Sequence, residues 1–201
     1  AVSVLTMILS PAAINLTGMY SSRLGAIGFL KRFASNEDFP VEPLTDPVIV
    51  VGVGLNGRNV ARVLRRSGIP YLVLEMNGIT VRSAKSKGEP ICFGDGAVPE
   101  MLKRLNIQSA KALVVAISDP AATRKIVQIA RAENRRLYII ARTRYLVEVE
   151  DLQRLGADMV IPEEFETSIE IFSHLLSLFN VPDSEIAEYV NEIRKDSYKM
   201  L

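Results

Sequence analysis

Short apolar runs alternate along the chain with longer segments in which apolar residues recur every three or four positions. The short runs are rich in Val, Ile and Leu, so they predict buried strands, whereas the longer segments predict amphipathic helices. The predicted strands are 48–53, 71–75, 91–93, 112–117, 137–141 and 159–161, and the helices between them are 57–67, 79–87, 99–105, 121–133 and 145–155.

This alternation of strand and helix predicts the α/β fold class. Nearly continuous apolar strands indicate a parallel sheet that is covered on both faces. Six such strands predict a doubly wound, mostly parallel, Rossmann-like sheet with the strand order 3-2-1-4-5-6. We expect residues 48–161 to form this domain.

Two further helices follow the sixth strand, within residues 162–201. Apolar residues form a stripe on each of them: Ile169, Phe172, Leu175, Leu176 and Phe179 on the first, and Ile186, Val190 and Ile193 on the second. Because the sheet is already complete, the stripes predict a helical dimerisation arm that packs on a second copy of the chain. The alternative is an arm that folds back on its own domain.

The start of the chain has a different composition. Residues 1–22 carry no charged side chain, and Arg23, Lys31 and Arg32 follow. An apolar lead followed by cations predicts the end of a transmembrane helix and a juxtamembrane segment in residues 1–33. A buried or interfacial helix is the alternative. Because residues 1–33 would be only the end of a membrane-embedded part, we interpret the chain as a fragment of a longer protein. Residues 34–47 contain three prolines and four acidic residues, which predicts an extended acidic linker.

The first predicted strand leads into Gly52, Gly54 and Gly57, which have the spacing G-x-G-x-x-G, and a helical pattern begins at once. In a dinucleotide-binding fold these glycines provide a tight turn, clearance for a pyrophosphate and close contact between helix and strand. Glu75 ends the second predicted strand, where a carboxylate accepts hydrogen bonds from ribose hydroxyls and repels a 2′-phosphate. The pattern therefore predicts an adenine-nucleotide site that prefers NAD(H) or another adenine nucleotide to NADP(H).

Other polar residues follow the carboxyl ends of the predicted strands, where ligands bind in sheets of this kind. The candidate nucleotide-binding residues are Gly52, Gly54, Leu55, Asn56, Gly57, Glu75, Met76, Asp95, Gly96, Ser118, Asp119 and Arg142. Each also has a simpler interpretation as a turn glycine, a helix cap or a solvated side chain, and only their convergence on one edge indicates a site.

Charge and composition exclude several other classes of function. The 24 basic and 23 acidic residues nearly cancel, so nothing indicates a nucleic-acid partner. The single cysteine, Cys92, lies in a predicted strand and is interpreted as a buried hydrophobic residue, and with one histidine a zinc site is hard to assemble. His174 lies in the arm, far from the glycines, and no segment remains for a substrate domain. We therefore predict binding without catalysis, and no metal.

These residues resemble the regulatory nucleotide-binding domain of potassium transport proteins, the RCK or Trk-N family. The resemblance covers about residues 47–161 and rests on the Val-Gly-Val-Gly-Leu-Asn-Gly loop, Glu75, the Gly-Asp pair at Asp95 and the Ala-Arg pair at Arg142. Segments 7–11 and 155–168 resemble those that flank the domain in Kef-type cation:proton antiporters. Leu55 departs from the family pattern, because glutathione-gated members carry a basic residue there.

The resemblance implies a homodimeric domain that faces the cytoplasm at the bacterial inner membrane. It would bind AMP or NAD(H) and control potassium efflux by potassium/proton antiport in the attached membrane domain. A nucleotide-gated potassium channel is the nearest alternative, because it would use the same cytoplasmic domain. A peripheral Trk-type subunit fits the apolar lead less well, and an NAD-dependent oxidoreductase would need a substrate domain.

Overall fold

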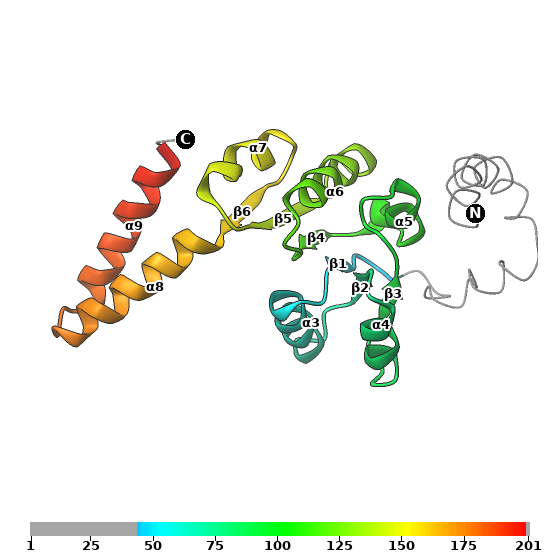
Figure 1. Cartoon of the computed structure of the whole chain (residues 1–201), viewed down its shortest axis with the longest axis horizontal. Helices are drawn as coiled ribbons and strands as arrows, with labels where there is room; N and C mark the ends of the chain where they lie inside the picture. Colours follow the sequence, from blue (N-terminus) through cyan, green and yellow to red (C-terminus); the bar gives the residue numbers. More distant parts are fainter. Residues whose placement is uncertain (1–43, 200–201) are drawn as a thin grey trace, which may run out of the picture. The chain divides into compact units, whose positions relative to one another are not determined.

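The computed structural model describes residues 44–199. Strands and helices alternate through most of this range, as the sequence predicts (Figure 1). The strands are β1 (Val48–Val51), β2 (Tyr71–Glu75), β3 (Ile91–Phe93), β4 (Ala112–Val115), β5 (Tyr138–Thr143) and β6 (Met159–Pro162). The helices are α3 (Leu55–Arg66), α4 (Gly78–Lys85), α5 (Pro99–Arg104), α6 (Pro120–Glu133), α7 (Val149–Arg154), α8 (Glu163–Leu178) and α9 (Asp183–Lys199), with 3-10 turns at η2 (Ile107–Ser109) and η3 (Leu146–Glu148).

The strands form one parallel sheet in the order β3-β2-β1-β4-β5-β6, which confirms the predicted doubly wound Rossmann-like fold. β1 lies at the centre, where its Val51 pairs with Leu74 of β2 on one side and with Val115 of β4 on the other. The strand order reverses between β1 and β4. The carboxyl ends of these two strands therefore border the crevice in which doubly wound sheets bind ligands.

The two faces of the sheet are covered by different helices. α3 and α4 cover one face, over Val50 and Val73, whereas α5, α6 and α7 cover the other, over Ile49, Leu113 and Ile139 (Figure 1). Right-handed crossovers explain this division, because connections that run toward β3 and connections that run toward β6 place their helices on opposite faces.

The same rule leaves part of the first face without a helix. On β5 and β6, Tyr138, Met159 and Ile161 point to that face and are 44%, 46% and 41% exposed. Ile161 also borders a groove of about 700 Å³, which is lined by residues of α3, β4, β5, β6 and α8. Along their strands these residues alternate with the buried Ile139 and Val160, so they lie on the opposite face of the sheet. This open face of the sheet is therefore apolar.

α8 and α9 form a helical hairpin after β6. The turn between them places Asn180 in the left-handed region (φ 58°), and the Val181 N–H donates to the Leu176 carbonyl oxygen at 3.2 Å. Ile169 of α8 and Ile186 of α9 are buried, and Arg194 of α9 pairs with Glu166 of α8 at 2.7 Å. Each of the two predicted apolar stripes therefore has a residue that is buried in the folded chain.

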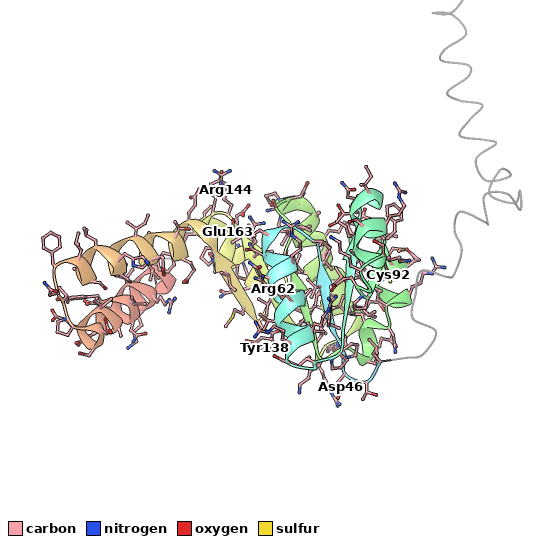
Figure 2. All side chains as sticks on the ribbon, turned by 90° about the horizontal axis from the view of Figure 1, so that it is seen from below. Asp46, Arg62, Cys92, Tyr138, Arg144 and Glu163 are labelled. Atoms are coloured by element: carbon pink, nitrogen blue, oxygen red, sulfur yellow. The ribbon has the colours of Figure 1, made fainter. Side chains whose placement is uncertain are left out.

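Other apolar residues of the hairpin remain exposed on its outer surface. Leu178 is 76% exposed and Phe179 71%, and Ile171 and Leu175 are exposed as well. Figure 2 shows Glu163 and Arg144 where the hairpin leaves the sheet. The hairpin by itself therefore buries only some of the apolar residues of α8 and α9.

Some predicted boundaries were wrong for a local reason. The first strand ends at Val51 instead of residue 53, because Gly52 adopts φ 96° and turns the chain out of the sheet. α3 begins at Leu55, before the predicted position 57. The predicted membrane-helix end (1–33) and most of the predicted linker (34–47) lie outside the described residues. Within residues 44–199, no helix is both long and apolar enough to cross a membrane.

Candidate nucleotide site at the carboxyl edge of the sheet

The amino terminus of α3 presents backbone donors at the strand-order reversal. Gly54 is its N-cap residue, and the first intrahelical bond runs from the Arg58 N–H to the Gly54 carbonyl oxygen at 3.1 Å. The N–H groups of Leu55, Asn56 and Gly57 come before that bond and lack an intrahelical acceptor. α3 has neither a side-chain cap nor an acidic residue in its first turn, whereas α6 is capped by Asp119. The donors and the helix dipole therefore suit an anion.

Two of the three glycines are required by close packing around the turn. A Cβ added to Gly57 would lie 1.9 Å from the Gly52 carbonyl oxygen, so α3 approaches the turn more closely than any side chain allows. A Cβ on Gly52 would lie 2.6 Å from the Ile117 side chain, at a positive φ that disfavours other residues. Around Gly54, by contrast, there is open space within 4 Å. This is the position where the fold needs clearance for a ligand.

Glu75 lies beside this loop and is held by the backbone. Its Oε2 accepts a hydrogen bond from the Val53 N–H at 2.9 Å, and its Oε1 accepts one from the Asn77 N–H at 2.7 Å. These bonds fix the carboxylate at the end of β2, next to the glycine turn. Each carboxylate oxygen has a further lone pair for another donor, such as a ribose hydroxyl.

The remaining residues of the first half of the sheet surround the same edge. Leu55 and Met76 are exposed apolar side chains at 69% and 62%. Asp95 follows β3, where its Oδ1 accepts a hydrogen bond from the Ala97 N–H at 2.8 Å. Gly96 is buried, and a Cβ there would lie 3.1 Å from Val51 and 3.2 Å from Ile126. Asp95 and Gly96 thus shape a tight loop at this edge.

The second half of the sheet contributes Ser118, Asp119 and Arg142. Asp119 has the capping role, because its Oδ1 accepts from the Ala122 N–H at 2.8 Å. Arg142, at the end of β5, donates through Nη1 to the Ile117 carbonyl oxygen at 3.1 Å and to Ser118 Oγ at 2.9 Å. It therefore ties β5 to the loop after β4.

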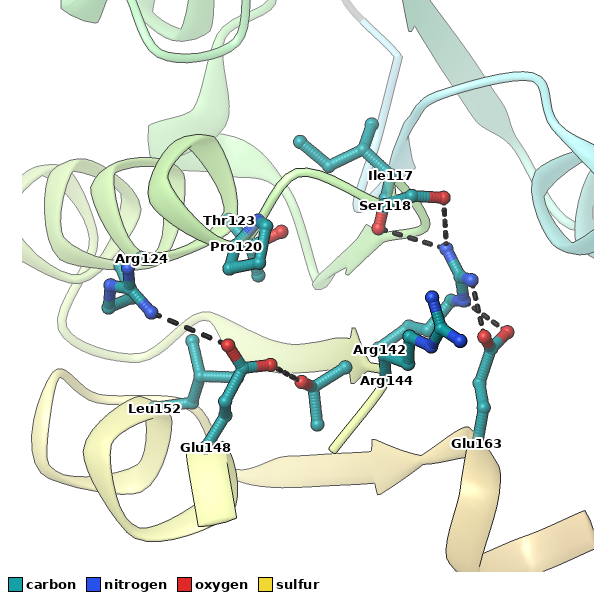
Figure 3. Close-up of a pocket in the computed structure, with 11 residues that line it drawn as sticks. Ile117, Ser118, Pro120, Thr123, Arg124, Arg142, Arg144, Glu148, Leu152 and Glu163 are labelled. Carbon is teal, nitrogen blue, oxygen red and sulfur yellow. Dashed lines mark hydrogen bonds and ion pairs between the residues drawn. The ribbon is translucent and has the colours of Figure 1, made fainter. Parts of the chain in front are cut away.

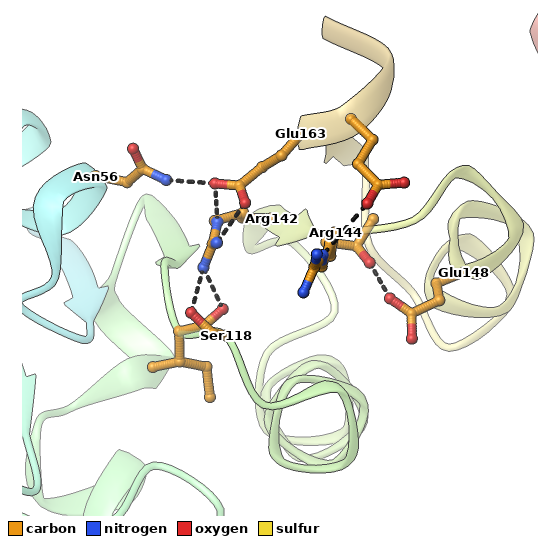
Figure 4. Close-up of polar contacts among 9 residues, drawn as sticks. Asn56, Ser118, Arg142, Arg144, Glu148 and Glu163 are labelled. Carbon is orange, nitrogen blue, oxygen red and sulfur yellow. Dashed lines mark hydrogen bonds and ion pairs between the residues drawn. The ribbon is translucent and has the colours of Figure 1, made fainter. Parts of the chain in front are cut away.

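Arg142 also forms a two-pronged ion pair with Glu163, the first residue of α8 (Figure 4). Asn56 of the glycine loop donates to Glu163 Oε1 at 2.9 Å, so one carboxylate joins the loop, the sheet and the arm. The hydrogen bonds from Arg142 lower the pKa of Glu163, against the opposing effect of burial. Glu163, Glu164 and Glu166 all lie in the first turn of α8, where any carboxylate suits the positive end of the helix dipole, so the sequence does not single out Glu163.

A cleft of about 250 Å³ opens next to this ion pair, between the ends of β4 and β5 and the start of α6 (Figure 3). Arg124 pairs with Glu148 at 3.7 Å, and the same carboxylate accepts a hydrogen bond from Thr143. Arg144 pairs with Glu164 at 3.3 Å. Arginines and carboxylates thus alternate around the cleft.

Other candidate chemistry lies away from this edge. His174 is an exposed residue of α8 within 3.0 Å of Glu170, and Cys92 is buried in β3. In the described part of the chain, no three His, Cys, Asp or Glu residues gather in a way that would hold a metal ion. The predicted site residues, by contrast, lie at the carboxyl edge of the sheet, in the loops that leave it or in the first turn of α3.

A doubly wound sheet with a glycine turn and a carboxylate at the end of β2 defines a nucleotide-binding type of domain. The TrkA-N domain model matches residues 48–163, and the chain belongs to this family. This confirms the resemblance drawn from the glycine loop and its flanks.

Curated relatives are potassium transport proteins. The chain is 30% identical over 165 residues to the K(+) efflux antiporter KefB of Alkalimonas amylolytica, covering 82% of this chain. It is 31% identical over 159 residues to K(+) efflux antiporter 1, chloroplastic, of Arabidopsis thaliana, covering 77% of this chain. The chain spans only 25% and 13% of the lengths of these relatives.

Solved structures share the fold. The TrkA-N domain of the inner membrane protein ybaL from Escherichia coli is 28% identical, with a TM-score of 0.64 over 67% of this chain and 99% of that one. The AMP-bound Kef C-terminal domain of Shewanella denitrificans is 23% identical, with a TM-score of 0.66 over 76% of this chain and 94% of that one. The GsuK channel bound to NAD is 18% identical, with a TM-score of 0.62 over 81% of this chain and 29% of that one.

Proposed function

We propose that this domain binds an adenine nucleotide, AMP or NAD(H), and thereby regulates potassium efflux by potassium/proton antiport in an attached membrane domain. The observation that carries the proposal is the pairing of an uncapped α3 amino terminus with the Glu75 carboxylate across the glycine turn. The first suits a phosphate and the second a ribose. Potassium efflux antiporters among the relatives support the transport assignment.

Regulation requires that the nucleotide bind two arrangements of the protein with different affinity. The Asn56–Glu163–Arg142 cluster supports such coupling, because it links the glycine loop directly to the first residue of α8. A ligand that changes this cluster would change how the arm leaves the sheet. The arm would pass that change to a second copy of the chain and to the membrane domain.

The proposed assembly is a homodimer through the arm. Leu178 and Phe179 on the hairpin, and Tyr138, Met159 and Ile161 on the open face of the sheet, are exposed apolar side chains that a second copy would cover. The proposed location is the inner membrane of a bacterium, with this domain in the cytoplasm. In this proposal the domain senses the nucleotide without converting it.

Binding is tested by titrating AMP, NAD, NADH and ATP against the thermal unfolding of the chain. We expect AMP or NAD(H) to raise the unfolding midpoint at millimolar concentration, because a ligand that binds only the folded state stabilises it. If none of them raises it, the nucleotide assignment is wrong. Turnover with candidate alcohols and acids, followed at 340 nm, would instead support the oxidoreductase alternative.

Transport is tested in membrane vesicles that contain the complete protein. AMP or NAD(H) should change the rate at which potassium exchanges for protons, and Gly54→Asp, which places a carboxylate at the phosphate position, should remove that response. An unchanged rate would exclude regulation by these nucleotides. A potassium current without proton movement would support the channel alternative.

A further inference from the structure

The amino edge of the sheet, opposite the candidate nucleotide site, carries a row of cationic side chains. All strands run parallel, so each helix between two strands ends at this edge, and each following loop enters the next strand there. Five exposed cations at this edge form no ion pair with any described residue: Arg66 at the end of α3, Lys87 before β3, Lys111 before β4, and Arg135 and Arg136 before β5. We call this row the basic edge.

Carboxylates at the same edge do not balance the row, because most of them already have a cationic partner. The paired carboxylates and their partners are Glu89 with Arg65, Glu133 with Lys103, Asp151 with Arg154 and Asp158 with Arg131. Asp46, just before β1, is exposed and forms no such pair in the described part of the chain. An excess of positive charge therefore remains at the basic edge.

The helix dipole explains only part of this excess. A cation in the last turn of a helix is favoured by the negative end of the dipole, and Arg66 has that position in α3. The other four cations of the basic edge lie in the loops that lead into β3, β4 and β5. The dipole acts only within the last turn, so it does not account for them.

The chain enters the domain through β1, at the centre of the basic edge. The Lys111 N–H donates to the Pro47 carbonyl oxygen at 3.0 Å, and the Tyr138 N–H donates to the Lys111 carbonyl oxygen at 3.2 Å. These bonds hold the loops before β4 and β5 beside the entry point. Figure 2 shows Asp46 at this end of the domain and Arg144 at the opposite end. The segment before Pro47 is therefore attached to the domain among these cations.

The arm has the opposite charge. Residues 163–199 contain nine acidic and three basic side chains, and α8 begins at the carboxyl edge with Glu163 and Glu164. The domain is thus positive where the chain enters it and negative where the arm leaves it. An anionic surface would attract the basic edge and repel the arm, so the nucleotide site would face away from that surface.

We propose that the basic edge lies on the anionic phospholipid headgroups of the membrane to which the domain is attached. The proposal rests on the membrane location proposed above and adds the surface that the domain turns toward the lipid. Lys and Arg side chains near a cytoplasmic leaflet are attracted by its negative surface potential. The predicted linker, residues 34–47, spans at most about 50 Å when fully extended, so it keeps the basic edge within reach of the headgroups.

Energy transfer to a headgroup-labelled lipid tests the proposal with the unchanged 201-residue chain as background. Gln108→Cys places a fluorophore at the amino edge, and Val147→Cys places one at the carboxyl edge as the matched control. Both side chains are exposed, whereas the native Cys92 is buried. Transfer is measured in phosphatidylcholine vesicles with and without phosphatidylglycerol. We expect phosphatidylglycerol to raise transfer from Gln108→Cys at least about twofold, and about 0.5 M salt to remove the rise by screening. Transfer from Val147→Cys should change much less.

Charge reversal identifies the residues responsible. Arg135→Glu with Arg136→Glu reverses two charges of the basic edge and should abolish the rise at Gln108→Cys. Arg62→Glu with Lys125→Glu is the matched control, because it reverses two exposed cations of α3 and α6 that lie outside the basic edge. It should keep most of the rise. A rise that survives reversal of Arg135 and Arg136, or that both pairs of substitutions remove equally, would contradict the proposal.

The remaining results separate this proposal from the membrane location itself. If the chain stays in solution with both kinds of vesicle, the location and the lipid contact both fail. If the chain binds but transfer ignores phosphatidylglycerol, the lipid contact alone is wrong. A rise that requires neutral replacements of Glu37, Asp38, Glu42 and Asp46 would mean that the acidic linker covers the basic edge instead. Circular dichroism verifies folding, and the salt response of the unchanged background decides the question if the Arg135 and Arg136 variant is unfolded.

Discussion

Gly57 lies so close to Gly52 that an added Cβ would stand 1.9 Å from the Gly52 carbonyl oxygen. α3 is thereby held against the end of β1, and its first-turn N–H groups point over the glycine turn. The third glycine of the motif is therefore required by the packing of the domain itself, whether or not a ligand is bound.

Gly57→Ala should destabilise the domain by roughly 2–3 kcal/mol, because the helix must move away from the turn to admit a methyl group. Gly54→Ala is the matched control, since nothing lies within 4 Å of the added Cβ. Its free energy of unfolding should stay within about 1 kcal/mol of the unchanged chain. Urea unfolding measures both, and equal losses for the two variants would contradict the steric argument.

Glu75 should determine selectivity against a 2′-phosphate. NAD should bind measurably and NADP at least about tenfold more weakly, because the fixed carboxylate repels the extra phosphate. Glu75→Gln should narrow this difference by weakening NAD binding and relieving the repulsion of NADP. Calorimetric titration of both cofactors provides the measurement, and an unchanged ratio would assign selectivity to another residue.

The ion pair of Glu163 predicts a dependence of stability on pH. Since the hydrogen bonds from Arg142 lower the pKa of Glu163, its stabilising contribution is complete above the ordinary glutamate pKa of about 4.3. The contribution is lost as the pH falls below that value and the folded-state carboxylate takes up a proton. Because the pair is partly exposed, we expect it to be worth roughly 1 kcal/mol.

The measurement compares urea unfolding of the unchanged chain and of Glu163→Gln at pH 7 and pH 3. The two should differ at pH 7 and approach each other at pH 3. Glu164→Gln, whose carboxylate is more exposed at 56%, should show a smaller difference at pH 7. A gap that persists at pH 3 would mean that Glu163 stabilises the fold by packing and not by its charge.

Phe179→Asp should weaken the proposed dimer. Phe179 is 71% exposed at the end of α8, so a charge there costs the monomer little, whereas a charge buried between two copies is costly. Tyr189→Asp is the control, because it introduces the same charge on α9 at a side chain that is 40% exposed, and it should leave the dimer unchanged. Sedimentation equilibrium should give a dimer for the unchanged chain and a shift toward monomer for Phe179→Asp. A monomeric unchanged chain would disprove the arm as the dimer interface.

The strand order and the edge that carries the candidate site could be predicted from the sequence, because both follow from local patterns and the handedness of crossovers. The role of Glu163 could not. Any carboxylate in the first turn of α8 satisfies the helix dipole, and Glu163, Glu164 and Glu166 do so equally in sequence terms. Which one reaches Arg142 and Asn56 depends on how α8 leaves β6, and Asn56 is 107 residues away from Glu163 along the chain.

The end of the first strand illustrates a second limit. Val53 continues the apolar run, so the pattern extends the strand through it. In the folded chain Gly52 turns away from the sheet, and the Val53 N–H donates to Glu75 instead of to a neighbouring strand. Hydrophobic periodicity does not contain this information, because it depends on a side chain from the next strand.

The open apolar face over β5 and β6 links the stability of a single copy to the amount of protein present. Tyr138, Met159 and Ile161 can lose their contact with water only when something else covers them. If a second copy does so, association adds free energy to the folded state alone, and dilution takes that free energy away. The melting temperature should then rise with total protein concentration, and a domain that is dilute in the cell would be less resistant to proteases than the same domain held in pairs.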